Sequence, residues 1–414
     1  MSKKEIKLGV IGLGKRGMDL MFLSVDLGRN IRVTAVCDEY YERAMNAAEQ
    51  IKLKTGNAPE IVTTDYKEVI TSGKVDCVIV ATAWEDHVRV SVEAMKAGVI
   101  VGCEVGGAYS VDDCYELVRT YEETNTPFML LENCCYGRKE LMALDMKRKG
   151  IFGKISHCTG SYNHDLREEI LGGYTTKHYR LRNYIRRNCE NYPTHELGPI
   201  AKILDINRGN RMISLVSVAS KSNGMKEYVK EHAKDIPELL DTDFRQGDII
   251  NTIITCANGE TILLTLDTTL PRYGSRNFSV RGTKGGYFEE NDSVYLEADG
   301  NDPETPWRPN WGNGLKYFNE HKPALWEKYG EEAVNSGHGG MDYMVLSAFY
   351  ESIETGAPMP IDVYDAASWM VISCLSEASL ACGSFVAIPD FTRGGWTKYN
   401  KPEKKPETEF WLND

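Results

Sequence analysis

The chain has 414 residues, 42% of them hydrophobic, a length and composition that suit two globular domains better than one. Its 48 basic and 60 acidic residues leave a net charge of 48 − 60 = −12 without any basic block, which argues against a nucleic acid or an anionic membrane as a partner. The 11 cysteines include no C-x-x-C pair, and no apolar run indicates a signal peptide or a membrane span. We therefore expect a cytoplasmic protein that acts on a small molecule.

The first predicted elements are a strand, a glycine-rich turn and a helix. The apolar run Leu8 to Ile11 predicts a buried strand, and Met18 to Leu27 carries apolar residues at helical spacing. Between them lie Gly12, Gly14 and Gly17, spaced as G-x-G-x-x-G. This spacing lets the backbone approach a pyrophosphate at a helix N-terminus, and it indicates a dinucleotide-binding fold.

The next predicted strand supplies the acidic residue that such a fold uses. It runs from Ile31 to Cys37 and is followed by Asp38, about 20 residues beyond the last glycine. A carboxylate at this position binds the ribose hydroxyls and repels a 2'-phosphate. The sequence therefore favours NAD over NADP.

Predicted helices and strands continue to alternate up to about residue 133. We expect helices over 41–52, 65–71, 86–97 and 111–124, and strands over 75–81, 99–103 and 127–131. With the fingerprint on the first connection, this order predicts an α/β domain over residues 1–133, with a doubly wound parallel sheet of the Rossmann type.

Polar residues follow three successive strands of this predicted sheet. Trp84 to His87 follow the strand over 75–81, Glu104 ends the next strand, and Asn133 follows the last one. Because the carboxyl ends of parallel strands meet at one edge, where doubly wound sheets bind ligands, we expect these side chains to face a ribose, a nicotinamide amide or a sugar.

From about residue 155 the chain becomes rich in strands. We predict strands over 155–162, 212–219, 249–257, 260–267, 276–282 and 293–297, and helices over 193–204, 226–233, 341–354 and 363–381. Asn258-Gly259 predicts a hairpin. We therefore expect an α+β domain over residues 134–388 with a large, open, mainly antiparallel sheet, which favours a homo-oligomer.

Two segments give weaker signals. Residues 299–340 are too irregular to assign, and the polar residues 389–414 predict a tail on the surface or on a neighbouring subunit.

The second domain also carries candidate catalytic residues. Tyr192 and His195 open the predicted helix over 193–204, where a neutral imidazole can act as base and acid near pH 7. Tyr162 ends a predicted strand, Tyr273 follows another, and Arg180 lies in a basic run. Each of these residues taken singly could also be an ordinary surface or core residue.

Two other kinds of site are disfavoured. The His and Cys residues show no C-x-x-C, H-x-x-x-H or H-E-x-x-H spacing, so we expect no metal. The G-x-S-x-G motif of serine hydrolases is also absent.

The chain as a whole resembles the Gfo/Idh/MocA superfamily, in which a Rossmann domain precedes an open-sheet substrate domain. In detail it is similar to glycoside hydrolase family 109, the NAD-dependent α-N-acetylgalactosaminidases. The similar segments are Trp84-Glu-Asp-His87, Glu104-Val-Gly-Gly-Ala108, Glu132-Asn-Cys-Cys-Tyr136, Tyr162-Asn-His-Asp-Leu-Arg167, Tyr192-Pro-Thr-His195 with Leu197-Gly-Pro199, Leu204-Asp-Ile-Asn-Arg-Gly209 and His338-Gly-Gly-Met-Asp342.

This resemblance implies a site and a mechanism. NAD would be tightly bound and not consumed, and the glycoside would be cleaved by transient oxidation at C3, elimination of the C1 substituent, water addition and re-reduction. The implied cofactor-binding residues are Gly12, Gly14, Arg16, Gly17, Asp38, Trp84, His87, Glu104, Val105 and Asn133. The implied catalytic residues are His195, Tyr162 and Tyr192, and the further substrate-binding residues are Arg180, Pro193, Thr194 and Tyr273.

Two departures from the related patterns bear on function. Sugar dehydrogenases of the superfamily usually carry Glu-Lys-Pro where this chain has Glu104-Val105-Gly106, and the missing lysine favours the hydrolase. The stretch between Tyr162 and Tyr192 is shorter than in the best-known members, which leaves the sugar open. The alternatives are an NAD-dependent sugar or inositol dehydrogenase and a non-catalytic NAD sensor.

Overall fold

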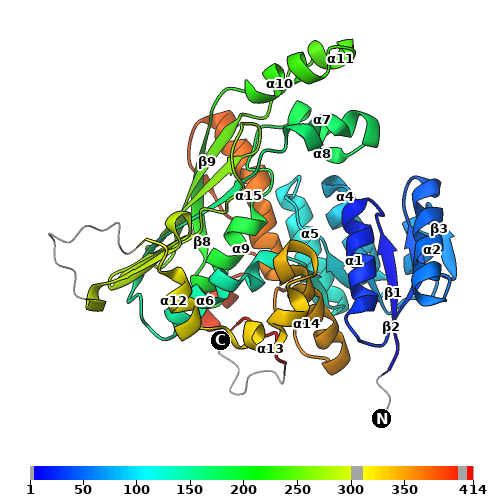
Figure 1. Ribbon diagram of the computed structural model, residues 1–414, viewed down its shortest axis with the longest axis horizontal. Helices are drawn as coiled ribbons and strands as arrows, with labels where there is room; N and C mark the ends of the chain where they lie inside the picture. Colours follow the sequence, from blue (N-terminus) through cyan, green and yellow to red (C-terminus); the bar gives the residue numbers. More distant parts are fainter. Residues whose placement is uncertain (1–3, 300–310, 400–407, 414) are drawn as a thin grey trace. The chain divides into compact units, whose positions relative to one another are not determined.

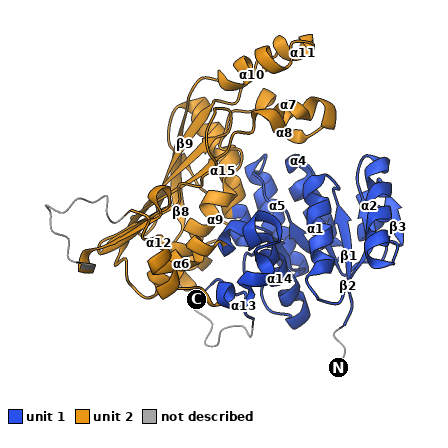
Figure 2. Ribbon diagram, in the orientation of Figure 1, with its two compact units in different colours: residues 1–136, 325–367, 400–414 blue, residues 137–324, 368–399 orange. Residues whose placement is uncertain are grey.

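The computed structural model describes residues 4–299, 311–399 and 408–413 (Figure 1). The chain forms two compact units, which Figure 2 shows in different colours. Unit 1 comprises residues 1–136, 325–367 and 400–414, and unit 2 comprises residues 137–324 and 368–399. The domain boundaries that the sequence suggests, after residues 133 and 388, stay predictions.

Unit 1 contains a parallel sheet of six strands in the order β3-β2-β1-β4-β5-β6. The order reverses between β1 and β4, and this switch point is where doubly wound sheets bind ligands. The predicted Rossmann sheet is confirmed, and β3 is the strand that the sequence pattern did not indicate. The strands are β1 (Ile6–Ile11), β2 (Ile31–Cys37), β3 (Ile61–Thr63), β4 (Cys77–Val80), β5 (Ile100–Cys103) and β6 (Phe128–Leu130).

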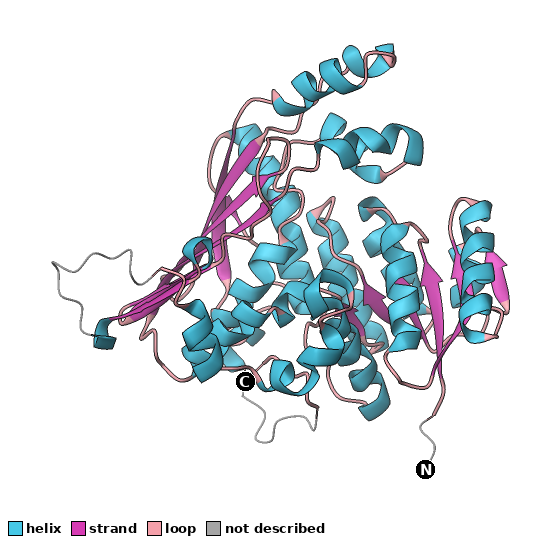
Figure 3. Ribbon diagram, in the orientation of Figure 1, coloured by secondary structure: helices cyan, strands magenta, loops and turns pink. Residues whose placement is uncertain are grey.

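Helices flank the strands of this sheet, as Figure 3 shows. A later part of the chain also packs on it, because a Cβ on Gly102 of β5 would lie 3.1 Å from the ring of Phe349, and the Leu130 N–H donates to the carbonyl of Ile361. The helices are α1 (Lys15–Asp26), α2 (Tyr41–Thr55), α3 (Tyr66–Ile70), α4 (Trp84–Lys96), α5 (Val111–Thr124), α13 (Ala324–Ala333) and α14 (Met341–Thr355).

Unit 2 contains a mixed sheet of eight strands in the order β13-β12-β11-β7-β10-β9-β8-β14. Every neighbouring pair is antiparallel except β7 with β10, so the expected open, mainly antiparallel sheet is confirmed. Gly259 turns the predicted hairpin between β9 and β10 with φ +96°. The strands are β7 (Ile155–Asn163), β8 (Met212–Ala219), β9 (Ile249–Cys256), β10 (Thr261–Asp267), β11 (Ser279–Gly282), β12 (Gly285–Phe288), β13 (Ser293–Leu296) and β14 (Val386–Ala387).

One glycine allows a helix of unit 2 to lie close on its sheet. A Cβ on Gly160 of β7 would lie 2.8 Å from the Cβ of Glu196 in α9, so only glycine permits this approach. The packing fixes the start of α9 against the strand that carries Tyr162. The helices of the unit are α6 (Arg138–Arg148), α7 (Arg167–Thr176), α8 (Tyr179–Arg186), α9 (Thr194–Ile203), α10 (Gly224–His232), α11 (Pro237–Leu240) and α12 (Gly314–Glu320), and α15 (Val363–Cys382) begins in unit 1.

The structure corrects three expectations. The segment 299–340, which was too irregular to assign, contains α12 and α13. The strand predicted from residue 276 begins three residues later, at Ser279.

No described helix combines the length and the apolarity that crossing a bilayer requires.

The third correction concerns the tail predicted to lie on the surface. Phe410 is buried, its ring stacks on Tyr329 at 5.3 Å, and its carbonyl accepts a hydrogen bond from the hydroxyl of Tyr136. Aromatic and aliphatic residues near the end anchor the chain in unit 1 even though the stretch as a whole is polar. The most polar part of the predicted tail, residues 401–407, lies outside the described residues.

Candidate active site

The glycine turn of unit 1 has the geometry that a dinucleotide needs. Gly12 has φ +93°, and a Cβ there would collide with the carbonyl of Ala81, while a Cβ on Gly17 would collide with the carbonyl of Gly12. A Cβ on Gly14, by contrast, would meet no atom within 4 Å. The first and third glycines are therefore required by the chain itself, and the second leaves open space beside the turn.

The N-terminus of α1 has the features of an anion-binding site. Gly14 caps the helix without any side-chain hydrogen bond, and the first turn contains no acidic residue. The first N–H groups of a helix have no partner within the helix, and they carry a partial positive charge. The turn can therefore bind a pyrophosphate.

Asp38 lies buried at the end of β2, next to this turn. One carboxylate oxygen accepts the Leu13 N–H at 2.7 Å, and the other accepts the Tyr40 N–H at 3.0 Å. These bonds orient the carboxylate while each oxygen keeps a further lone pair. It can therefore accept from the ribose hydroxyls of a dinucleotide.

Two buried polar atoms at the strand ends also fit a cofactor. His87 Nε2 bonds the carbonyl of Thr82 at 3.0 Å, while its Nδ1 has no partner among the described residues. Burial lowers the pKa of His87, so the imidazole is neutral. Asn133 donates from Nδ2 to Asp342 at 2.7 Å, and its Oδ1 lacks a partner within the described part of the chain. Buried polar groups are normally hydrogen-bonded, so both atoms are suited to a donor or acceptor of a bound ligand.

Arg16 is held by two carboxylates. Its guanidinium donates to Glu104 at 3.0 Å and to both oxygens of Asp342 at 2.6 and 3.0 Å. Asp342 lies in the His338-Gly-Gly-Met-Asp342 segment, for which the sequence predicted no role. The sequence feature that could have indicated Asp342 is the pair of glycines before it. His338, Gly339 and Gly340 all have positive φ, so the chain turns sharply before α14.

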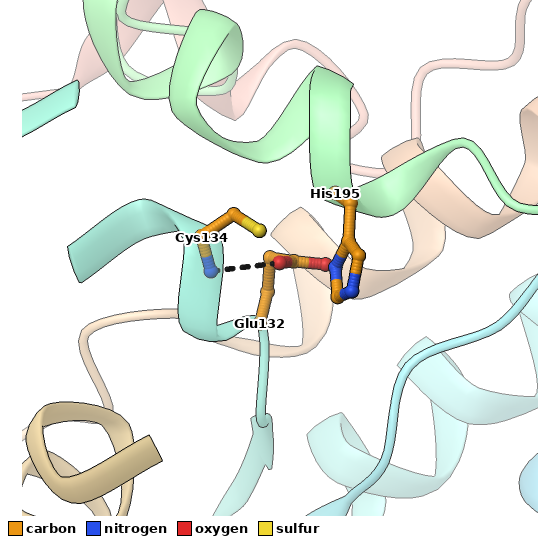
Figure 4. A group of neighbouring side chains, drawn as sticks. All are labelled: Glu132, Cys134 and His195. Carbon is orange, nitrogen blue, oxygen red and sulfur yellow. Dashed lines mark hydrogen bonds between the residues drawn. The ribbon is translucent and has the colours of Figure 1, made fainter. Parts of the chain in front are cut away.

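Glu132 lies between β6 and the neighbouring short helix. Its carboxylate accepts the backbone N–H of Cys134 at 3.0 Å, as Figure 4 shows, and the side chain is buried. Figure 4 also labels His195, which lies in the first turn of α9 in unit 2.

In unit 2, three predicted residues form one aromatic cluster. The ring of Tyr162 lies 4.4 Å from that of Tyr192 and 5.7 Å from that of His195, and the rings of Tyr192 and His195 are 4.8 Å apart. Tyr162 comes from β7, Tyr192 lies just before α9, and His195 lies in the first turn of α9. The packing of α9 on Gly160 of β7 thus brings together residues that are 30 positions apart in the sequence.

Arg180 of α8 supplies a buried cation to this cluster. Its guanidinium lies 5.8 Å from the ring centre of Tyr162 and 5.1 Å from that of Tyr192, and one nitrogen is 3.5 Å from the Tyr162 hydroxyl. Burial raises the pKa of Tyr162 to about 12, although Arg180 acts to lower it. The phenol is therefore protonated at neutral pH. Glu169, which no sequence pattern indicated, pairs with Arg180 at 2.6 Å.

The remaining predicted residues of unit 2 lie around this cluster or apart from it. Pro193 caps α9, and Thr194 is its first residue and is buried. The ring of Tyr273 is 94% exposed and is not packed into the cluster. His164, which was not predicted for this role, packs on Tyr162 at 4.6 Å, and burial lowers its pKa to about 4, so it is neutral.

Two buried carboxyl groups flank the Tyr192–His195 segment. Glu190 precedes it and Glu196 follows it, and both side chains are buried. Burial raises the pKa of Glu190 to about 8, although the Tyr192 N–H and the Glu196 side chain act to lower it. Nothing in the sequence pattern distinguishes these two residues among the 60 acidic ones.

Comparisons with known proteins agree with both units. Residues 6–131 match the oxidoreductase family with an NAD-binding Rossmann fold, and residues 136–398 match the glycosyl hydrolase 109 C-terminal domain. A levoglucosan dehydrogenase in complex with NADH shares the fold, with a TM-score of 0.68 at 19% identity over 93% of this chain and all of that one.

Curated relatives are similar over nearly the whole length. A glycosyl hydrolase family 109 protein of Stenotrophomonas maltophilia is 37% identical over 96% of this chain and 91% of its own. The α-N-acetylgalactosaminidase of Tannerella forsythia is 36% identical over 94% of this chain and 87% of its own. The chain therefore belongs to glycosyl hydrolase family 109, the NAD-dependent glycosidases of the Gfo/Idh/MocA superfamily.

Proposed function

We propose that this protein hydrolyses α-N-acetylgalactosaminides with an NAD that stays bound and is not consumed. Relatives from Tannerella forsythia and Shewanella oneidensis carry the name α-N-acetylgalactosaminidase, which supports the choice of substrate. The observation that carries the proposal is the cluster of Tyr162, Arg180, Tyr192 and His195, because it offers a proton donor, a proton acceptor and a cation together. A non-catalytic sensor would have no need of this set.

The first step needs a base at the C3 hydroxyl of the sugar. When bound, NAD supplies hydride transfer, first from the sugar and later back to it, so the net reaction is hydrolysis. We assign the C3 hydroxyl proton to His195, which takes it during oxidation and returns it during re-reduction. Val105 stands where dehydrogenases of the superfamily usually have a lysine, so the proton transfer falls to this histidine.

The second step is the elimination. A ketone at C3 acidifies the C2 hydrogen, and loss of that proton to a base expels the C1 substituent as the C1–O bond breaks. Tyr162 gives its proton to the departing oxygen, because the buried phenol is protonated at neutral pH. Tyr192 orients the rings of Tyr162 and His195. Arg180 holds a hydroxyl or the acyl oxygen of the sugar.

The decisive experiment incubates the purified full-length protein in D2O with an aryl N-acetyl-α-galactosaminide and no added cofactor. We expect release of the aglycone and deuterium at C2 of the released sugar. The matched 3-O-methyl glycoside should be inert, because it cannot be oxidised at C3. Aglycone release without C2 deuterium would reject the elimination.

The same preparation separates the other two candidate functions. Formation of NADH from a free sugar with added NAD, without aglycone release, would identify a dehydrogenase. Bound NAD with neither activity would identify a sensor.

We also propose that the open face of the unit 2 sheet binds a second copy of the chain. Val218 of β8 and Ile253 of β9 are 65% and 44% exposed on this sheet. Burying such apolar strands favours association. Sedimentation of the wild type and of a Val218→Glu, Ile253→Glu double variant tests this, and a wild-type monomer would contradict it.

A further inference from the structure

A cluster of three charged side chains lies where the nicotinamide half of a dinucleotide belongs. In a doubly wound sheet the adenosine ribose lies at the β2 side, here at Asp38, and the nicotinamide half lies beyond the switch point, over β4 to β6. Glu104 directly follows β5, and Arg16 reaches it from the glycine turn. The cluster is completed by Asp342, at the start of α14.

This cluster carries an excess negative charge. Two carboxylates share one guanidinium, so their formal sum is −1. The carboxylates are buried, and Asp342 accepts additional hydrogen bonds from Asn133 at 2.7 Å and from His338 at 2.8 Å. Hydrogen bonding to His338 and Arg16 outweighs burial and holds the pKa of Asp342 well below its usual range, so it stays ionised.

Neighbouring groups do not cancel this charge. The buried histidine of α4, His87, is kept neutral because burial lowers its pKa. His338 is half exposed, and a neutral imidazole can donate its Nδ1 hydrogen to Asp342 without adding a charge. Lys15 of the same turn is exposed and already pairs with Asp19 at 2.6 Å. A ligand that enters beside Asn133 Oδ1, which has no partner among the described residues, meets a negative potential.

We propose that the Glu104–Arg16–Asp342 cluster makes this protein bind NAD+ more tightly than NADH, and so keeps the resident cofactor oxidised between turnovers. The nicotinamide ring is a cation in NAD+ and neutral in NADH, so a nearby excess of one negative charge favours the oxidised form. The inference rests on the proposed function, in which each catalytic cycle must begin with NAD+. The burial of the cluster keeps salt from screening its field.

The test compares both redox forms on the full-length protein. Dissociation constants for NAD+ and NADH are measured at pH 8 for the wild type and for Asp342→Asn, which removes one charge at nearly constant shape. We expect the wild type to bind NAD+ more tightly than NADH. In the variant, the ratio of the dissociation constant for NADH to that for NAD+ should be about tenfold smaller. Redox titration of the bound cofactor, followed by NADH absorbance, should then show a midpoint potential higher by about 30 mV, the tenfold equivalent for two electrons.

Glu354→Gln is the matched control. It removes one negative charge at the other end of the same helix, from a comparable pair with Arg29 at 2.5 Å. We expect its preference for NAD+ to equal that of the wild type. An equal shift in both variants would show that only net charge matters and would overturn the proposal.

Two further outcomes would also overturn it. One is a wild type that binds NADH as tightly as NAD+. The other is an Asp342→Asn variant that weakens both forms equally, because that result would make Asp342 only a structural support. A failure of glycoside hydrolysis would reject the proposed function without touching these binding constants, so the two failures are distinguishable.

Discussion

A Cβ on Gly106 would lie 2.6 Å from the indole Cδ1 of Trp84. The Trp84 side chain is buried and occupies the space that any other residue at position 106 would need. In the related dehydrogenase motif a proline stands at this position, so the glycine and the tryptophan form a complementary pair.

We predict that Gly106→Ala lowers both stability and NAD affinity. Forcing a methyl group against the indole costs about 1 to 3 kcal/mol by overpacking, and the displaced ring disturbs the start of α4. Thermal unfolding and NAD binding measure the two effects. Gly172→Ala is the control, because a Cβ there meets nothing within 4 Å. Wild-type behaviour of Gly106→Ala would show that Trp84 can move without consequence.

A second prediction concerns Arg180. Arg180→Lys should lower kcat/KM about 10- to 100-fold, because lysine lacks the planar fork that lies against both tyrosine rings. Steady-state kinetics with an aryl glycoside measure the loss. Arg186→Lys makes the same change at an exposed position of the same helix and should leave the kinetics unchanged. Equal activity of the two variants would remove Arg180 from the site.

The sequence was most informative where local pattern decides the structure. The glycine turn, Asp38 and the Tyr192–His195 segment follow from spacing over a few residues, and each lies at an end of a predicted element that the structure contains. Asp342 could not be assigned in this way, because its partner Arg16 is 326 residues away. Glu190 and Glu196 could not be singled out for another reason: their burial distinguishes them, and composition does not reveal burial.

The third prediction uses the buried carboxyl group of Glu190. Its pKa of about 8 in the folded protein exceeds the usual value of about 4.5, so folding is favoured most below pH 4.5 and loses this contribution as the pH rises through 8. The unfolding free energy should therefore fall as the pH rises between these two values. Chemical unfolding at pH 5 and pH 8.5 measures it.

Glu190→Gln carries no titrating group, so its unfolding free energy should fall less than that of the wild type between these pH values. Glu227→Gln, at an exposed position of α10, should follow the wild type. If Glu190→Gln shows the wild-type pH dependence, the proton is not held by this carboxyl group.

The fourth prediction separates two roles for Tyr162. If the protonated phenol acts as the acid that assists the leaving group, Tyr162→Phe should lose about 10²- to 10⁴-fold in kcat with a poorly leaving alkyl aglycone. The loss should be much smaller with a nitrophenyl aglycone, which departs without protonation. Tyr174→Phe deletes a partly exposed hydroxyl in α7 and serves as the control. An equal loss with both aglycones would mean that Tyr162 instead takes the C2 proton, and deuterium exchange at C2 should then fall in parallel with aglycone release.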